Sequence, residues 1–438
     1  MKKFLLKLFG KDQAEKRDHD ALPVLDPRVR PLTPTPSNQE EFCQSAIEAT
    51  AQSPFFQKLP SEIRTKILTM AFGGRTVHMD LWQDHPDVEI HKKDKTSDGA
   101  HVHGRKRVYT AGRPGYKYVK RNLKEPKQWI WQGSVCHRNV PEPWKRFWKE
   151  LEPSEDFCRY GGLGITDVGD ICELWHAQDG EASCNIGAMG WLLSCRQACH
   201  SYKEGIEVLY STNTIHSASK LMLLNLDKLL LPQRLSSIKS LELIWTFDPY
   251  LGDCEPTQEP CRDFRSFEKL LEALPVFFPR VQRLHVAIQG EIFPGERKAR
   301  GGWGFMKDIS KAIEIVEKDI LTPFDEMVHR LGPGAREVTL ACSAYLYARA
   351  REVALENNVA IVEQIHLGAE KERHWRAFLG GKGRNNHLGG YWVQLGQRDL
   401  SPVHLHIASS FAFATPIIPQ EQRAFASPSS LWYADLRR

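Results

Sequence analysis

Apolar residues recur at four-residue intervals in a short segment between residues 59 and 74. The apolar positions are Ile63, Ile67, Leu68 and Ala71. This spacing repeats about once per helical turn, so it predicts a helix with one apolar face. Pro60 suits the first turn, because its fixed φ favours the helix and its missing N–H needs no partner there. Gly73 and Gly74 follow the last apolar position and predict the end of the helix.

A second and longer apolar stripe lies more than a hundred residues further along the chain. Its positions are Leu192, Cys195, Cys199, Tyr202, Ile206 and Leu209. The steps between them alternate between three and four residues, which is the spacing of one helix face. The stripe predicts a helix of about seventeen residues and is the most regular helical pattern in the sequence.

Strand and helix patterns alternate after this second helix. Apolar alternation predicts strands over residues 237–245, 281–288 and 336–342, and later over 359–367, 391–395 and 403–407. The segments 264–278 and 305–331 are long enough for the helical crossovers that parallel strands need, and a further helix is expected over 345–356.

The spacing of these strands bears on the fold class. Leu241 and Leu284 are 43 residues apart, and Leu284 and Val338 are 54 apart. Both distances exceed the roughly 20 to 29 residues of an ordinary leucine-rich repeat. We therefore expect a mixed α/β fold: an irregular β/α layer with mainly parallel strands, for which a degenerate leucine-rich-repeat-like solenoid is one arrangement.

Changes in composition suggest the domain organisation. Residues 1–52 are charged and rich in proline and predict a disordered leader. Residues 53–245 form a first domain, which from about 82 to 189 is interrupted by glycine and proline and predicts an irregular, basic insertion. Only short strand-like pieces, such as 107–110 and 128–132, are expected within it. We expect the β/α layer over residues 246–420 to continue the same domain and residues 421–438 to form a frayed tail.

Composition limits the class of protein. The chain is 41% hydrophobic and 26% charged, and its apolar runs are shorter than the eighteen or so residues of a transmembrane helix. The ten cysteines show no disulfide-like spacing. These features predict a protein without a transmembrane segment in a reducing compartment, the cytoplasm or the nucleus. They leave the oligomeric state open.

Local catalytic and metal-binding motifs are absent from the sequence. Cys195 and Cys199 share the apolar helix stripe, so we interpret them as core thiols rather than zinc ligands. The pairs His101–His103 and His404–His406 lack a third ligand at suitable spacing, and we interpret them as solvated strand histidines. The sequence predicts a non-enzymatic protein with no cofactor and no metal.

One segment of the chain is strongly basic. Residues 92–127 contain twelve Lys or Arg against three acidic residues, whereas the whole chain carries a net charge of +5. Tyrosines and tryptophans lie in or beside this segment, and cations with aromatic rings suit single-stranded nucleic acid. A second expected function is therefore a nucleic-acid-binding protein that uses residues 92–131. The candidate residues are Arg105, Lys106, Arg107, Lys117, Lys120 and Arg121. The alternative is a solvated insertion whose rings pack back onto the core.

The two helical segments together carry a family resemblance. The first reads Leu-Pro-x-Glu-Ile from Leu59, and the second reads Cys-Arg-Gln from Cys195 and ends in Leu-Tyr-Ser-x-Asn at Asn213. In this combination the chain resembles a large fungal family of uncharacterised proteins, built on a domain of unknown function that begins with an F-box-like helix. The resemblance covers roughly residues 53–245.

The F-box resemblance implies a partner and a surface. F-box proteins dock on a Skp1-like adaptor of a cullin ubiquitin ligase while a downstream domain holds a protein substrate. By analogy, the adaptor-binding residues would be Leu59, Pro60, Ile63, Ile67 and Leu68. In an ordinary F-box the partner helix follows within a few tens of residues, whereas here it lies much further on. The apolar face could instead be buried inside its own domain.

Overall fold

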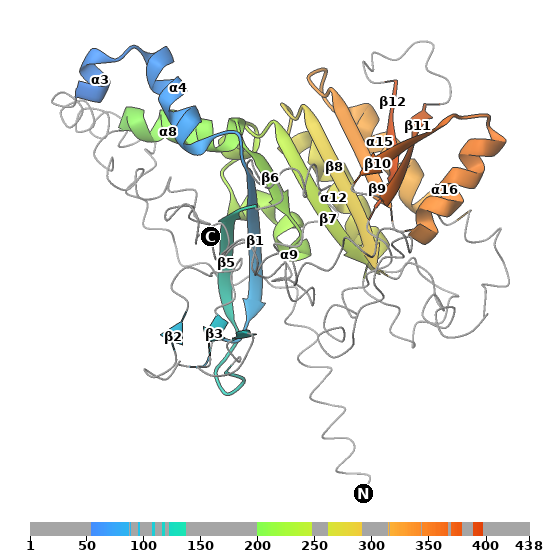
Figure 1. The fold of residues 1–438 in the computed structure, drawn as a ribbon, viewed down its shortest axis with the longest axis horizontal. Helices are drawn as coiled ribbons and strands as arrows, with labels where there is room; N and C mark the ends of the chain where they lie inside the picture. Colours follow the sequence, from blue (N-terminus) through green and yellow to red (C-terminus); the bar gives the residue numbers. More distant parts are fainter. Residues whose placement is uncertain are drawn as a thin grey trace, which may run out of the picture.

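The centre of the molecule is a nine-stranded mixed sheet with strand order β10-β11-β12-β9-β8-β7-β6-β1-β5 (Figure 1). The computed structural model describes residues 54–86, 88, 95–96, 107–109, 116–118, 122–136, 199–247, 262–290, 314, 316–342, 344–366, 369–378 and 389–396. The strands of the sheet are β1 (Thr76–Asp84), β5 (Gln128–Val135), β6 (Thr214–Ser217), β7 (Ser240–Phe247), β8 (Arg283–Gly290), β9 (Glu337–Cys342), β10 (Ile361–His366), β11 (Ala369–Ala377) and β12 (Gly390–Leu395).

Six neighbouring strands of this sheet, β1, β6, β7, β8, β9 and β12, run parallel to one another. Both ends of the sheet are antiparallel: β5 pairs with β1, and β11 pairs with β12 and β10. The expectation of a mixed α/β fold with mainly parallel strands is confirmed. These nine strands form one open sheet, and the described residues do not show a solenoid.

One face of the sheet is apolar and is covered by helices. These helices are α9 (Lys220–Leu223), α10 (Leu226–Leu229), α11 (Pro232–Leu235), α12 (Arg262–Phe277), the π-helix η3 (Glu317–Leu321), α15 (Thr322–Arg330) and α16 (Ala344–Glu356). Alternate residues of β7, such as Leu243 and Trp245, are fully buried in one cluster with Phe267 of α12 and Phe324 of α15. The helices expected between and after these strands, 264–278, the described part of 305–331, and 345–356, therefore cover the core.

The other face of the sheet combines a row of polar residues with a small buried apolar cluster. The pairing register aligns His78, His216, Glu242, His285 and Thr339 across five successive strands from β1 to β9. His216 Nδ1 lies 3.1 Å from Glu242 Oε2. The rings of His78 and His216 meet edge to face with centroids 4.7 Å apart. His78 and His216 are almost completely buried in this row, and Glu242 gives the His216 ring a hydrogen-bonding partner.

Ion pairs hold the far end of the sheet against its helices. Arg376 of β11 binds both carboxylate oxygens of Asp325 on α15, at 2.8 to 3.2 Å, and also pairs with Glu317 of η3. Arg351 of α16 pairs with Glu372 of β11, with Nε 2.6 Å from Oε2. These two arginines thus connect β11 to η3, α15 and α16.

The strand β5 lies inside the segment from 82 to 189 that we expected to be an irregular insertion, and it extends the strand-like piece expected at 128–132. It is regular, and it pairs with β1 over eight residue pairs from Val77–Val135 to Asp84–Gln128. A separate three-stranded sheet follows the end of β1, made of β2 (Lys95–Thr96), β3 (Arg107–Tyr109) and β4 (Tyr116–Tyr118). Part of the expected insertion is therefore an edge of the main sheet.

Three helices stand apart from the layer that covers the sheet (Figure 1). They are α3 (Pro54–Lys58), α4 (Ser61–Phe72) and α8 (Cys199–Ser211). Both long stripes predicted from the sequence therefore correspond to helices, although residues 192–198 of the second lie outside the described residues. The predicted leader, the predicted strand at 403–407 and the predicted tail also lie outside them. None of the helices in the described part of the chain is long and apolar enough to cross a membrane.

Candidate protein-interaction surface

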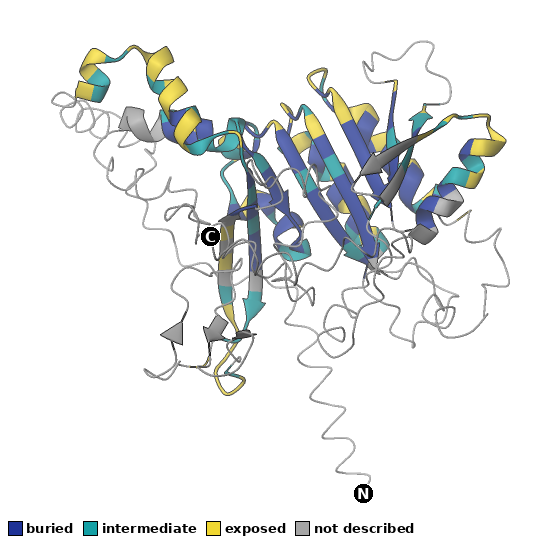
Figure 2. Cartoon of the chain, viewed as in Figure 1, coloured by how far each residue is buried: buried dark blue, intermediate teal, exposed yellow. Residues whose placement is uncertain are grey.

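Helix α4 exposes a row of large apolar side chains. Ile63 is 44% exposed, Ile67 is 41% exposed and Met70 is 76% exposed. These three positions, spaced four and three residues apart, share one side of the helix, which we call the α4 stripe. Figure 2 shows α3 and α4 mostly exposed beside a sheet whose strands are mostly buried. Isolated exposed apolar residues are common, but three on one helix face form a patch.

The five residues expected to bind an adaptor do not share one environment. Ile63 and Ile67 are exposed, Pro60 is exposed and Leu59 is half-buried. Leu68 differs from the expectation, because it is only 2% exposed and is the buried residue of α4. It follows Ile67 by about 100° around the helix, which turns it away from the stripe. Met70, which the sequence analysis did not select, joins the stripe instead.

A salt bridge fixes α4 against α8. The Arg64 guanidinium binds both carboxylate oxygens of Glu204, with Nη2 2.5 Å from Oε1 and Nε 3.0 Å from Oε2. Arg64 Nη1 also donates to the carbonyl of Leu59 at 2.7 Å, and its guanidinium lies over the ring of Phe56 in α3. One side chain therefore holds together three helices. The bidentate geometry orients α4 with its stripe outward.

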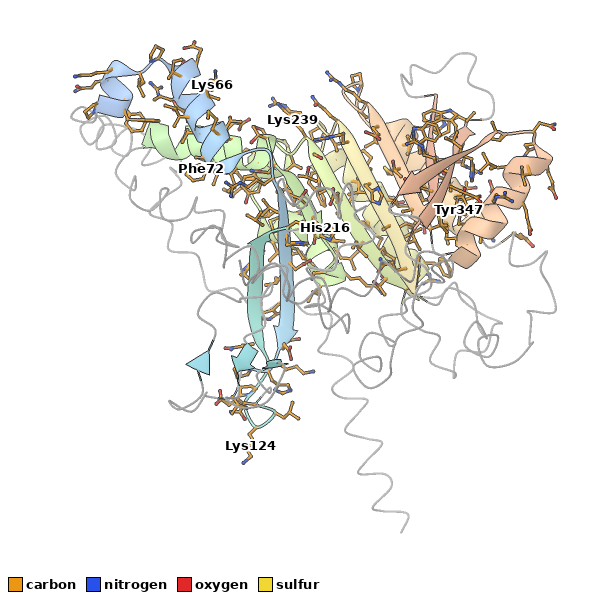
Figure 3. All side chains as sticks on the ribbon, in the orientation of Figure 1. Lys66, Phe72, Lys124, His216, Lys239 and Tyr347 are labelled. Carbon is orange, nitrogen blue, oxygen red and sulfur yellow. The ribbon has the colours of Figure 1, made fainter. Side chains whose placement is uncertain are left out.

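Asn213 joins the other ends of the same two helices. Its Nδ2 donates to the carbonyls of Phe72, at 2.8 Å, and Leu209, at 2.9 Å, while its Oδ1 accepts from the backbone N–H of Arg75 at 2.9 Å. The side chain is buried, and it satisfies the terminal carbonyls of α4 and α8 at once. Figure 3 labels Phe72 at this junction and Lys66 earlier in the same helix.

Two glycines shape the exit from α4. A Cβ on Gly73 would collide with Thr212 Oγ1 and would lie 2.8 Å from the carbonyl oxygen of Thr69. Gly74 has φ +69°, in the left-handed region that glycine adopts without strain. The chain can therefore turn sharply from α4 into β1 while α8 passes close by. The glycine pair was predicted to end the helix, and α4 does end at Phe72.

The basic candidates are only partly described. Arg107 lies in β3 and Lys117 in β4, while Arg105, Lys106, Lys120 and Arg121 lie outside the described residues. Cys195 and the two histidine pairs, His101–His103 and His404–His406, also lie outside the described residues. Within the described parts of the chain, no group of three or more His, Cys, Asp or Glu side chains could hold a metal ion.

The buried carboxylate of Asp80 has structural partners. Asp80 accepts hydrogen bonds from the backbone N–H of Ala218 at 2.7 Å and of Ser219 at 2.9 Å, and from Ser217 Oγ at 3.2 Å. Ser219 Oγ in turn donates to the carbonyl of Leu81 at 2.5 Å. These bonds tie the turn from β6 into α9 to strand β1. These hydrogen bonds explain why the Asp80 carboxylate can be buried in the fold.

The fold and the surface together define a mixed α/β protein with a projecting helical pair. Residues 132–340 match the model of a family described as a domain of unknown function, DUF7730. The match begins within β5 and ends within β9, so it includes α8 and leaves out α4. Neither the curated proteins nor the solved structures contain a significant match to this chain.

Proposed function

We propose that this protein is a non-enzymatic interaction protein that acts as an F-box-like substrate receptor, binding a Skp1-like adaptor through α4. The observation that carries the proposal is the α4 stripe, Ile63, Ile67 and Met70, on a helix that presents it to solvent. The resemblance to the fungal F-box-like family supports the same assignment. In this proposal the α/β layer holds a protein substrate, in the cytoplasm or the nucleus.

The way in which α4 is held supports a docking role. The Arg64–Glu204 ion pair and the Asn213 hydrogen bonds position the helix through its inner side. The outer stripe takes no part in these contacts. A helix that is fixed in advance loses little conformational freedom when a partner binds it, so more of the contact free energy appears as affinity.

A pull-down with purified Skp1-type adaptor and the full chain tests the proposal. The double variant Ile63→Glu/Ile67→Glu should reduce binding at least tenfold, because it would place two carboxylates in an apolar interface. Leu355→Glu is the matched control, since Leu355 is 47% exposed on α16, at the other end of the sheet. Circular dichroism should show the same helix content in all three proteins.

Two results would contradict the proposal. One is a wild-type chain that does not bind the adaptor at micromolar concentration. The other is binding that falls equally in the double variant and in the Leu355→Glu control, which would show that the α4 stripe is not the contact surface.

A further inference from the structure

Strand β5 forms one edge of the main sheet (Figure 1). It is paired with β1 on one side, and within the described part of the chain no strand is paired with its other side, which we call the outer edge. An edge strand of this length offers a row of main-chain N–H and C=O groups to another strand. The outer edge is therefore a candidate contact surface that does not depend on α4.

The pairing with β1 shows which residues of β5 present these groups. Cys136 N–H donates to the carbonyl of Thr76 at 2.8 Å, so Cys136 turns its main chain toward β1. Alternate residues of an antiparallel strand face the same neighbour, so the even-numbered positions of β5 also face β1. The odd-numbered positions turn their N–H and C=O groups to the outer edge, and these are Trp129, Trp131, Gly133 and Val135.

Two of these outward-facing positions complement each other. Trp131 is 46% exposed, although it lies opposite Leu81, which is 1% exposed. Gly133 is exposed, and a Cβ there would make only an ordinary contact, at 3.9 Å, with the carbonyl oxygen of His78. An aromatic ring can cover a glycine that lies opposite it in a neighbouring strand.

Strand β5 lacks the features by which natural edge strands avoid pairing. Its sequence, QWIWQGSV, contains no charged residue and no proline. The strand at the opposite edge, β10, is shorter and contains Glu363. Charged residues and prolines are common means of keeping sheet edges apart. Of the two edges, the one formed by β5 is therefore better suited to accept another strand.

We propose that β5 pairs antiparallel with β5 of a second copy of this chain, about a two-fold axis that passes through Gln132. In this register all four outward positions have partners, because Trp131 lies opposite Gly133 of the second copy and Trp129 lies opposite Val135. A shift by one residue would set outward positions against inward ones. The strand is thus its own complement, which favours a second copy over an unrelated peptide.

The same register brings the tryptophans together and keeps basic residues apart. The two Trp131 positions become diagonal neighbours at about 7 to 8 Å, which is within reach of aromatic rings. Exposed Lys127 precedes β5, so the Lys127 residues of the two copies would lie about 34 Å apart at about 3.4 Å per residue. This separation exceeds the Debye length of about 8 Å at physiological salt, so these lysines do not oppose the pairing.

Sedimentation velocity of the full chain from about 1 to 100 µM tests the proposal. Edge pairing buries less surface than a standard interface, so we expect dimers at micromolar concentration. Trp131→Lys should weaken dimerisation at least tenfold, because it makes two like charges diagonal neighbours. Val362→Lys is the matched control, since Val362 is 39% exposed on β10. Ile63→Glu/Ile67→Glu should stay dimeric, which distinguishes pairing through β5 from association through α4.

Gly133→Pro tests the main-chain contact itself. The variant removes an N–H that points to the outer edge, so pairing with β1 should persist, as circular dichroism would show. The missing donor and the proline ring should prevent pairing with the second copy.

Two cysteine variants test the register without weakening the contact. Gln132 would face its own copy with Cα atoms about 4.5 Å apart, which is close enough for a disulfide. Gln132→Cys should therefore form a covalent dimer on mild oxidation, measured by non-reducing electrophoresis against the wild-type background. Ser134→Cys is the matched control, because its two Cα atoms would lie about 14 Å apart, beyond the reach of a disulfide.

Three outcomes would overturn the proposal. The first is a chain that stays monomeric up to about 100 µM, which would leave the outer edge to an extended peptide of another protein. The second is dimerisation that is unchanged in both Trp131→Lys and Gly133→Pro. The third is covalent dimers that form as readily through position 134 as through position 132.

Discussion

Asn213 carries out several structural tasks with one side chain. It is 1% exposed and hydrogen-bonds to residues of α4, of α8 and of the turn before β1. Its position as the last residue of the Leu-Tyr-Ser-x-Asn pattern is visible in the sequence. Its partners are not, because Phe72 is 141 residues away along the chain.

Replacing Asn213 by alanine should lower the free energy of unfolding by about 2 to 4 kcal/mol, since buried backbone groups of both helices lose their partner. Asn357→Ala is the matched control: Asn357 Nδ2 also donates to the carbonyl four residues earlier, Val353, but at an exposed site. The control should cost less than about 1 kcal/mol. Urea denaturation measures both, and equal losses would contradict the role given to Asn213.

His374 makes stability depend on pH. Burial, assisted by Arg376 and Arg351, lowers the pKa of its imidazole from 6.5 to about 4. The unfolded chain therefore binds a proton that the folded chain does not bind between these values, and stability falls as the pH decreases from 7. His374→Gln should remove about 2 kcal/mol of the difference in unfolding free energy between pH 7 and pH 5. Urea titrations at both pH values decide, and a His374→Gln variant that keeps the full difference would contradict this role.

At the scale of elements, the junction of α4, α8 and β1 depends on close approach at Gly73. Gly73→Ala should lower stability by about 1 to 3 kcal/mol, because the new methyl group meets Thr212 Oγ1 and the carbonyl of Thr69. Gly334→Ala is the control, as a Cβ there meets nothing within 4 Å. Differential scanning calorimetry should show a lower Tm for the first variant alone. A Tm unaffected by Gly73→Ala would contradict the close packing at this junction.

Some strands of the main sheet could be predicted from the sequence, and others were not. Strands β7, β8 and β9 were expected because alternate positions such as Leu243, Val286 and Leu340 are apolar. Strands β1, β6 and β11 were not expected. Strand β6 has only four residues and β11 lacks an apolar alternation, whereas Val77, Met79 and Leu81 of β1 do alternate, so the signal for that strand was present in the sequence. The three strands carry the buried polar residues His78, His216 and His374. These residues are tolerated inside the fold because side chains from distant strands satisfy or pack against them, and no local pattern reports such partners.

At the scale of the whole molecule, protection against solvent should follow position in the sheet. Strands β7 and β8 lie near its centre and are paired on both sides, whereas α3 has no buried residue. Hydrogen exchange should therefore be slowest in β7 and β8 and fastest in α3. Mass spectrometry of deuterated peptides measures this order. Exchange in α3 that is as slow as in β7 would contradict the projecting position of the helices.

Local periodicity by itself determined the presence of α4, α8, the core strands and the mixed α/β class. It could do so because the geometry of a helix or a strand repeats within a few residues. Only the tertiary structure decided that β1 pairs with both β5 and β6, that Leu68 is buried, and that Ile63, Ile67 and Met70 face solvent. An apolar helix residue has the same sequence signal whether it faces a core or a partner. The neighbours that distinguish the two cases, such as Glu204 and Asn213 on or beside α8, come from far along the chain.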